Sequence, residues 1–318
     1  MKIKTVCVLG GSGFVGRHLI HHLTERGYDV RVLTRHRERH RDLLVLPTLT
    51  LFEADVYNVQ TLTDHFSGCD AVINLIGILN EKQHDGSGFR RAHVTLPHIV
   101  IKACANTGIE RLLHMSALNA DARNGPSYYL RSKGEGEDLV HSIEGLQVTS
   151  FRPSVIFGPG DSFFNRFAQL LKRIPLLFPL ACPRARFAPV YVEDVAEAFT
   201  RALANPATFG ARYDLCGPRV YTLQELVEYS ARVLGIRRKI IGLSDNLSHL
   251  QARIFEWLPG KPFSLDNYHS LQRDSVCRGA FPEVFEIKPQ PLESVVPAYL
   301  VPHSIKLRYQ HYRSRHSG

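Results

Sequence analysis

A glycine-rich turn between an apolar run and a helical pattern restricts the fold of this chain more than any other feature. Residues 5–9 predict a buried parallel strand, and glycines follow at Gly10, Gly13 and Gly16 before a helical pattern that stops at Gly27. At such a junction Gly10 permits the tight turn, Gly13 lets the backbone approach a pyrophosphate, and Gly16 lets the helix pack closely. The alternative is an ordinary glycine turn before a surface helix. Because strand, triplet and helix coincide, we predict a phosphate-binding turn at a helix N-terminus.

Strand and helix patterns alternate after this turn. Apolar runs over residues 29–34, 49–56, 69–77 and 111–116 predict four more strands, and a helix interrupted by Pro97 is expected over 92–105. This alternation predicts an α/β fold of the Rossmann type, with a doubly wound parallel sheet. Ligands of such sheets bind beyond the carboxyl ends of the strands, so Gly77 and Ser116 are expected at the same edge as the glycine turn.

The ends of the second and third strands carry the residues that would choose between dinucleotides. An acidic residue after the second strand would bind the ribose of NAD, but Arg35 stands there. A guanidinium suits a 2′-phosphate, so we expect NADP(H) to be favoured over NAD(H); a basic loop without this role is the alternative. Asp55 could accept a hydrogen bond from the adenine amino group, or it could cap the following helix.

A tyrosine and a lysine farther along the chain have the spacing of one helix face. Tyr129 and Lys133 are four residues apart, and Tyr128 has no lysine at that spacing. A phenol has a pKa of about 10, and a nearby ammonium lowers it. The alternative is a surface pair without chemistry. The order of glycine turn, strand-end glycine, strand-end serine and then this pair favours a reactive pair.

Together these motifs resemble an extended or atypical short-chain dehydrogenase/reductase of the NAD-dependent epimerase/dehydratase superfamily. The resemblance covers about residues 1–300 and is carried by residues 10–16, Ser116, 129–133, 152–161, 189–196 and 213–218. Residues 116–120 and 129–137 are most similar to the subgroup of the nucleotide-binding accessory subunit of respiratory complex I and its bacterial homologues. One departure is the short loop before Tyr129, which lies only 13 residues after Ser116.

The resemblance implies a role for each matching residue. Tyr129 would be the acid/base, Lys133 would hold the nicotinamide ribose and tune Tyr129, and Ser116 would polarise a carbonyl. Arg35 would meet the NADP phosphate and Pro153 would border the nicotinamide. The expected cofactor contacts are Gly10, Ser12, Gly13, Phe14, Val15, Gly16, Arg35, Asp55, Val56, Leu75, Gly77, Tyr129, Lys133 and Pro153. Members of the complex I subgroup can hold the nucleotide as a structural element, so the motif leaves turnover open.

The regular alternation weakens after residue 157. We expect an NAD(P)-binding domain over 1–157, to which part of 188–217 returns, a substrate or partner domain mainly over 158–300, and a basic tail over 301–318. A helix is predicted over 163–173, and the apolar segment 174–182 would suit a hydrophobic substrate, such as a quinone or isoprenoid, or form a core loop. Asp194 is expected to cap a helix over 195–204, and Thr222 with Glu225 predicts a capping box.

The composition limits the compartments and the classes of binding partner that are expected for this chain. The net charge is +9, which can favour phosphates, anionic membranes or nucleic acid, but no nucleic-acid-binding motif accompanies it. No apolar run approaches the roughly 18 residues of a membrane span, and the first strand leaves no room for a leader segment. The six cysteines and sixteen histidines show no pairing motif, so we expect no disulfide and no metal. These features predict a cytoplasmic protein, or one peripheral on the cytoplasmic face of a membrane.

Two functional hypotheses follow. The first is an NADPH-dependent oxidoreductase acting on a small apolar carbonyl or quinone-related compound. The second is an accessory protein of a respiratory complex or quinone pathway that binds the nucleotide without turning it over. A sugar-nucleotide epimerase or dehydratase is less favoured, because the second domain shows no clear nucleotide-diphosphate site.

Overall fold

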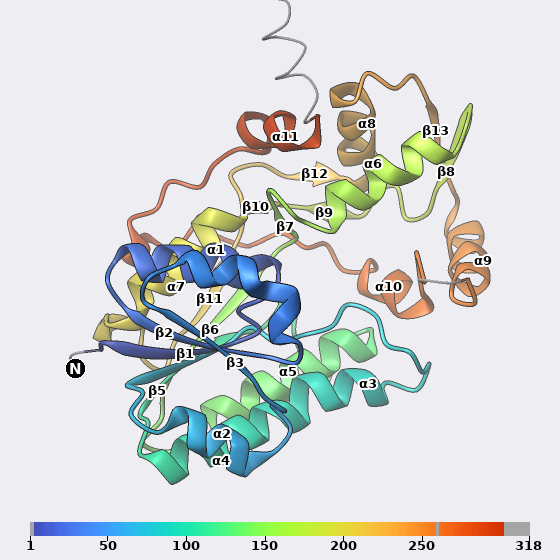
Figure 1. Cartoon of the computed structure of the whole chain (residues 1–318). Coiled ribbons are helices and arrows are strands. Elements are labelled where there is room, and N and C mark those ends of the chain that lie inside the picture. The colour runs from blue at the N-terminus through green and yellow to red at the C-terminus, as the bar shows by residue number, and fades with distance from the viewer. Residues whose placement is uncertain (1–2, 259–260, 302–318) are drawn as a thin grey trace, which may run out of the picture.

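A seven-stranded parallel sheet lies at the centre of the computed structural model, which describes residues 3–258 and 261–301 (Figure 1). Its order is β11-β6-β5-β4-β1-β2-β3. The strands are β1 (Thr5–Leu9), β2 (Asp29–Thr34), β3 (Leu49–Glu53), β4 (Ala71–Asn74), β5 (Arg111–Met115), β6 (Gln147–Pro153) and β11 (Arg212–Leu215). The chain leaves β1 toward β3 and returns to β4 on the other side, so the order reverses between β1 and β4. The predicted α/β fold with a parallel sheet is confirmed.

Helices cover both faces of the sheet (Figure 1). One face carries α1 (Phe14–Glu25) and α7 (Val192–Leu203), and the other carries α2 (Val59–Phe66), α4 (Leu96–Thr107) and α5 (Tyr128–His141). Side chains of β1 alternate between the two layers: Val6 and Val8 pack with α1 and α7, and Cys7 and Leu9 pack with α2 and α4. Burial on both sides explains why this strand is apolar at every position from Val6 to Leu9.

The helix expected over 92–105 is longer than predicted and contains a π turn. It runs through α3 (Ser87–Arg90), the π-helical segment η2 (Arg91–Thr95) and α4. Pro97 has no N–H, so it cannot bond the carbonyl of His93 within the helix. That carbonyl lies against Gly136 of α5, where a Cβ atom would come within 1.8 Å of the oxygen. The proline therefore sits beside a close helix contact and does not end the helix.

The second part of the chain has its own core above one end of the sheet (Figure 1). It contains α6 (Phe163–Arg173), α8 (Leu223–Val233), α9 (Asp245–Phe255), α10 (Leu265–Ser270) and α11 (Leu292–Leu300), with strand pairs β7 (Ile156–Phe157) and β10 (Val190–Tyr191), β9 (Arg186–Phe187) and β12 (Tyr221–Thr222), and β8 (Leu177–Leu180) and β13 (Lys239–Gly242). Short 3₁₀ segments are η1 (Arg37–Val45), η3 (Pro206–Thr208) and η4 (Glu283–Phe285). The predicted helix over 163–173 and the capping box of Thr222 and Glu225 are confirmed.

One predicted helix cap, Asp194, and one cap left open as an alternative, Asp55, are wrong. α7 begins at Val192, so Asp194 lies in its first turn, where its carboxylate accepts the N–H of Gln290 at 2.8 Å. The cap of α2 is Asn58, whose side chain accepts two backbone N–H groups of the first turn. Asp55 instead accepts the N–H of Tyr57 at 3.0 Å, which leaves it at the end of β3. In both cases the helix begins at a different residue from the one that the pattern indicated.

The apolar segment 174–182 is partly core and partly surface. β8 pairs in parallel with β13, and its Phe178 and Leu180 are buried. Leu176 and Leu177 remain 79% and 52% exposed. The segment therefore combines the two alternatives that the sequence left open.

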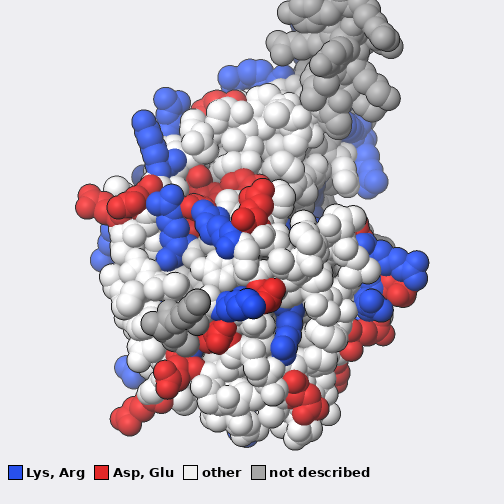
Figure 2. Space-filling view, turned by 60° about the vertical axis from the view of Figure 1, so that its left-hand side comes forward, with Lys and Arg blue, Asp and Glu red and all other residues white. Residues whose placement is uncertain are grey.

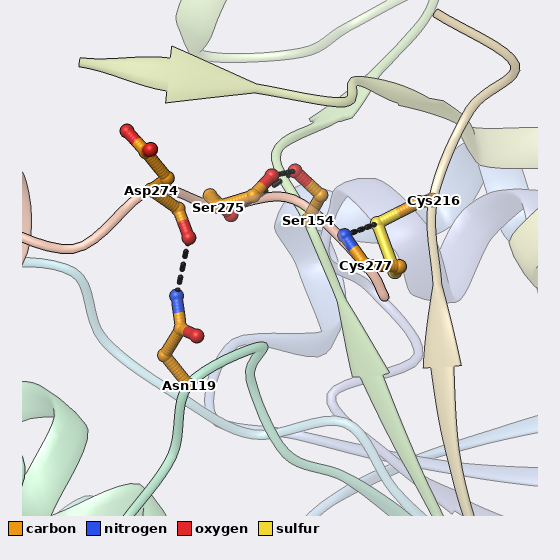
Figure 3. The surroundings of a disulfide bond; sticks show 6 residues. All are labelled: Asn119, Ser154, Cys216, Asp274, Ser275 and Cys277. Carbon is orange, nitrogen blue, oxygen red and sulfur yellow. Dashed lines mark hydrogen bonds between the residues drawn. A yellow bond between two sulfur atoms is a disulfide. The ribbon is translucent and has the colours of Figure 1, made fainter. Parts of the chain in front are cut away.

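Cys216 and Cys277 form a disulfide, so the expectation of six unpaired cysteines is wrong for these two (Figure 3). Their Cα atoms are 5.9 Å apart although 61 residues separate them in sequence. The chain after α10 returns along the sheet edge, where Ser154 Oγ donates to the carbonyl of Ser275 at 2.7 Å (Figure 3). Spacing alone cannot reveal this return. Cys7, Cys69, Cys104 and Cys182 are free thiols.

Two features, a membrane-spanning helix and a cluster of metal ligands, are absent from the part of the chain that the structure describes. There, no helix is both long and apolar enough to cross a bilayer, and no group of three or more potential metal ligands gathers. Figure 2 shows basic and acidic side chains interspersed on one face. The basic tail predicted over 301–318 lies outside the described residues, apart from Val301.

Candidate active site

The three glycines of the turn after β1 have different surroundings. Gly10 has φ +80°, in the left-handed region that favours glycine. A Cβ at Gly16 would lie 2.3 Å from the carbonyl oxygen of Gly10, so the backbone itself excludes a side chain there. A Cβ at Gly13 would meet only that same oxygen, at 3.2 Å. Packing within the protein therefore explains Gly10 and Gly16, while Gly13 faces open space.

The first turn of α1 lies next to this open space. Gly13 is the N-cap residue and has no side chain with which to cap the helix, and Phe14, Val15 and Gly16 follow it. Arg17, which the sequence analysis missed, braces the turn by donating from Nε to the carbonyl of Ser12 at 3.2 Å. Backbone N–H groups at such a helix start suit an anionic ligand. The residues of the turn thus fit the pyrophosphate of a dinucleotide.

Basic and aromatic side chains gather beyond β2 and β3. Arg35 is exposed directly after β2, and the guanidinium of Arg91 lies 4.3 Å from the ring centre of Tyr57. Burial raises the pKa of Tyr57, and the positive charges of Arg91 and Arg35 act against that rise. Asp55 and the buried Val56 lie at the same edge. Tyr57 and Arg91 were not predicted, because no local pattern brings the π turn to the end of β3.

Lys133 is buried at the end of β4 and β5. Its ammonium donates to the carbonyl of Met115 at 2.9 Å. A Cβ at Gly77 would lie 3.0 Å from this ammonium and 3.3 Å from Nε2 of His93, so glycine makes room for both side chains. Burial lowers the pKa of Lys133 to about 8, and the charge of Glu137 opposes that change. The structure therefore brings the predicted Gly77 and Lys133 together.

Tyr129 lies on the same face of α5 and contacts two rings. Its ring meets those of Phe89 and His93 edge-on, with centroids 6.0 and 5.5 Å apart. Burial raises the pKa of Tyr129, and the carboxylate of Asp266 raises it further. The expected lowering of this pKa by Lys133 is therefore wrong, because loss of solvent around the phenol decides the direction of the shift. Tyr129 is a protonated phenol at neutral pH.

His93 holds the start of α5 in place and was also missed by the sequence analysis. Its Nε2 accepts the N–H of Ile78 at 3.1 Å, so its Nδ1 carries the proton and donates to Ser132 Oγ at 2.9 Å. Ser132 in turn donates to the carbonyl of Tyr129 at 2.9 Å. Burial and the charge of Lys133 lower the pKa of His93 to about 2, which keeps the ring neutral. The loop after β4 is thereby tied to the turn that carries Tyr129.

Ser116 has a partner within the protein. It is buried, and its hydroxyl donates to Glu137 at 2.5 Å. Glu137 is fully buried and also forms ion pairs with Arg152 and Arg212, both at 2.8 Å. The hydroxyl cannot turn to a substrate while its bond to Glu137 holds. The role of Ser116 in polarising a carbonyl stays a prediction.

The remaining predicted residues border this centre. Leu75 follows β4 and donates its N–H to the carbonyl of Leu9 at 3.0 Å, at the point where the sheet order reverses. Pro153 is the buried last residue of β6, and its carbonyl accepts the N–H of Leu118 at 3.1 Å. Both lie at strand ends that share the carboxyl edge of the sheet.

A pocket of about 190 Å³ lies beside Phe89, between the loop after β4 and helices α9 and α10. Its polar lining includes Asn80, Gln83, His84, Glu256 and His269. Asp266 also lines it and accepts the N–H of Tyr128 at 2.6 Å. The second part of the chain thus forms one wall of a polar pocket next to the helix that carries Tyr129.

Residues 6–216 match the model of the NAD dependent epimerase/dehydratase family. The chain belongs to this family. The family implies an NAD(P) cofactor, which the open glycine turn and the uncapped start of α1 fit. It also accounts for the sequence resemblance described above, which the relatives confirm.

Two relatives and one solved structure illustrate the likeness. The mitochondrial NADH dehydrogenase (ubiquinone) 1 alpha subcomplex subunit 9 of Mus musculus is 34% identical over 228 residues, which are 70% of this chain but 59% of that protein. Ceramide reductase of Caulobacter vibrioides is 29% identical over 243 residues, 76% of this chain and 74% of that protein. The dTDP-glucose 4,6-dehydratase DesIV of Streptomyces venezuelae matches in fold, with a TM-score of 0.74, 17% identity and coverage of 96% and 98%. This chain spans less than two thirds of the length of the mouse subunit.

Proposed function

We propose that this chain is an NADP(H)-dependent oxidoreductase that reduces a carbonyl group of an apolar or amphiphilic substrate. The observation that carries the proposal is the buried Lys133 beneath Gly77, on the helix face that also presents Tyr129. A buried ammonium is costly unless the site uses it, and a nicotinamide ribose is a suitable partner for it. When bound, the reduced nicotinamide supplies the hydride.

Tyr129 is the proton donor in this scheme. The raised pKa keeps the phenol protonated, so it can donate a hydrogen bond to a substrate carbonyl oxygen. The alkoxide that forms on reduction is far more basic than a phenolate and takes the proton. Lys133 orients the ribose. Its pKa of about 8 is close to physiological pH, so its ammonium can exchange a proton there. His93 and Ser132 fix the first turn of α5 and thereby the position of Tyr129.

The preference for NADP(H) rests on the charges beyond β2. Arg35 takes the place of the acidic residue that would bind an unmodified ribose, and Arg91 adds a second guanidinium beside Tyr57. Two guanidinium groups suit a 2′-phosphate, which a carboxylate would repel.

The substrate class is inferred from the pocket and from one relative. The pocket is polar, but exposed apolar side chains of α9 and β8 lie on the same part of the molecule. The Caulobacter relative is named a ceramide reductase, and a ceramide combines a polar head with long apolar chains. An amphiphile with this division suits the site better than a sugar nucleotide. For its location we propose the cytoplasm or the cytoplasmic face of a membrane, in peripheral contact with it.

A second candidate function is favoured by the environment of Ser116. Its hydroxyl is bonded to Glu137, which leaves Tyr129 and Lys133 without a free serine beside them. The likeness to a subunit of NADH dehydrogenase agrees with a nucleotide-binding accessory protein associated with a respiratory complex. In that role Lys133 would hold the nucleotide without turnover.

Phenylalanine variants of the two neighbouring tyrosines separate these functions. NADPH oxidation is followed with carbonyl compounds of increasing chain length, and NADPH affinity is measured by calorimetry. Tyr129→Phe should lower turnover by about 10²–10⁴ with little change in affinity. Tyr128→Phe, one residue away, should leave turnover within a few-fold. If the unmodified protein binds NADPH and is stabilised by it but oxidises it with none of these compounds, the accessory role replaces the reductase.

A further inference from the structure

Helix α9, which lies on the right-hand side of Figure 1, has an apolar stripe that is exposed. Leu247, Leu250 and Ile254 are spaced by three and four residues and lie on one face, and all three are about half exposed. The opposite face contains Ser248 and Ala252, which are buried. Ser248 Oγ accepts the N–H of Cys182, so this face is packed on the chain that follows β8. Three of the large apolar residues of the helix thus face outward, while small residues form its buried face.

The stripe continues past the end of the helix. Trp257 is 79% exposed, and its ring stacks on His84 with centroids 5.1 Å apart. Leu258 follows and is also exposed. His84 and Glu256 line the polar pocket, and Nδ1 of His84 lies 2.9 Å from the carboxylate of Glu256. The exposed apolar surface therefore reaches the mouth of that pocket.

A second exposed apolar group lies on the strand pair that leads into α9. Leu177 of β8 lies opposite Lys239 of β13 in the register, and Ile241 of β13 is exposed two residues farther on. Leu176 precedes β8 with φ +58° and is 79% exposed. A non-glycine residue in the left-handed region is unfavourable, and here it holds a large apolar side chain in water. A water-soluble surface alone gives no reason for this arrangement.

Exposed basic side chains lie on α9, in the loop after β4 and along β13. They are Arg253 on α9, Lys82 two residues before His84, and Arg237 and Lys239 beside and on β13. Two carboxylates lie among them: Asp245 accepts the hydroxyl of Tyr268 at 2.8 Å, and Glu256 lies 2.9 Å from His84. Exposed leucine, isoleucine and tryptophan flanked by lysine and arginine is the composition of a helix that lies in a membrane interface.

We infer that α9, with Trp257 and Leu258, docks on an anionic lipid bilayer. The apolar stripe enters the headgroup region, and Arg253, Lys82 and Lys239 meet the lipid phosphates. The pocket mouth beside Trp257 then faces the bilayer, where an amphiphilic ligand could pass between lipid and protein. The docking surface does not depend on turnover, so it can be tested apart from the proposed function.

Trp257 is the single tryptophan of the chain and reports on this surface directly. Its fluorescence is recorded for the full-length protein with vesicles of phosphatidylcholine, and with vesicles that also contain phosphatidylglycerol. Docking predicts a blue shift with the anionic vesicles, quenching by brominated lipids and weakening by salt. An unchanged emission, or an equal shift with uncharged vesicles, would overturn the inference. A concentration-dependent blue shift without vesicles would overturn it in favour of self-association.

Variants assign the binding to the stripe. Leu250→Ser and Ile254→Ser should each weaken vesicle binding roughly tenfold to a hundredfold. Val45→Ser removes an exposed apolar residue from η1, outside the stripe, and should leave binding unchanged. Melting temperature and NADPH affinity are measured in each variant to show that the fold is retained. The basic residues of the tail lie outside the described residues, and quenching of Trp257 by brominated lipid reports on α9 and not on them. If quenching persists undiminished in both serine variants, the stripe is not the docking surface.

Discussion

The carboxyl edge of the sheet has two halves, which differ in whether their groups have partners within the protein. Beyond β1, β2 and β3, Gly13 faces open space and Arg35 is exposed. Beyond β4 and β5, Lys133 bonds a backbone carbonyl and Ser116 bonds Glu137. The half beyond β1, β2 and β3 leaves groups open to a ligand, whereas polar groups of the half beyond β4 and β5 are bonded within the protein. We therefore expect Gly13 and Arg35 to govern affinity for the cofactor, and Glu137 and Ser116 to govern stability.

The glycine turn offers the largest contrast. Gly16→Val would push its Cβ to 2.3 Å from the carbonyl oxygen of Gly10, and we expect destabilisation by about 3–5 kcal/mol or failure to fold. Gly13→Val should keep most of the stability but lose NADPH affinity by more than about a hundredfold, because the side chain fills the space of the pyrophosphate. Thermal melts and calorimetric titration check both. A Gly13→Val protein with unchanged NADPH affinity would show that the ligand lies elsewhere.

The buried carboxylate of the other half provides the next contrast. Glu137→Gln removes the buried charge that pairs with Arg152 and Arg212, and Arg212 keeps only its surface contact to Asp138. We expect a loss of about 2–4 kcal/mol in the free energy of unfolding, since both arginines are partly exposed. The neighbouring Asp138 pairs with Arg212 at the surface, so Asp138→Asn should cost less than about 0.5 kcal/mol.

Ser116→Ala sharpens this prediction. Removal of its bond to the charged Glu137 should cost about 1.5–2 kcal/mol and lower the melting temperature. If turnover fell strongly in this variant while the melting temperature stayed the same, the hydroxyl would serve a substrate and not the protein.

The smallest expected effect lies between α1 and α7. The hydrogen bond to Glu193 raises the pKa of His22 above 6.5, and bonds from His18 and His22 lower the pKa of Glu193 from 4.5 to about 2. The stability that the raised pKa of His22 contributes is complete below pH 6.5 and is lost as the pH rises through the folded pKa. The stability that the lowered pKa of Glu193 contributes is present above pH 4.5 and is lost as the pH falls toward 2. We expect His22→Gln to lower the free energy of unfolding by about 0.5–1 kcal/mol between pH 4.5 and pH 6.5, and by less at pH 9.

His21→Gln changes an exposed residue of the same helix and serves as the control. Denaturant melts across the pH range give the comparison. If His22→Gln lowered the free energy of unfolding equally at every pH, the charge of His22 would not be the source of this stabilisation.

Local pattern was sufficient for the parts of the molecule that local physics determines. The backbone of Gly10 and Gly16, the capping box of Thr222 and Glu225 and the helix over 163–173 depend on neighbours in sequence. The parallel arrangement of the strands follows from the alternation of strands and helices. For this reason the fold and the position of the glycine turn could be predicted.

Long-range contacts determine what could not be predicted. The bond between Cys216 and Cys277 needs the return of the chain after α10, and the bond between Ser116 and Glu137 needs α5 packed on β5. The pKa of Tyr129 is set by burial, to which distant segments contribute, and not by the lysine four residues away. Spacing identifies a pair of residues but does not describe the surroundings that decide their protonation.

Cofactor choice is the most direct test of the account, because it depends on the half of the site that the protein leaves open. The unmodified protein and Arg35→Asp are titrated with NADPH and NADH by calorimetry at fixed ionic strength. We expect NADPH to bind the unmodified protein more tightly by roughly tenfold to a hundredfold, from about 1.5–3 kcal/mol of charge-assisted contact, and the substitution to erase or reverse the preference. Equal affinities of the unmodified protein for both nucleotides, or binding of neither by a folded protein, would contradict the account.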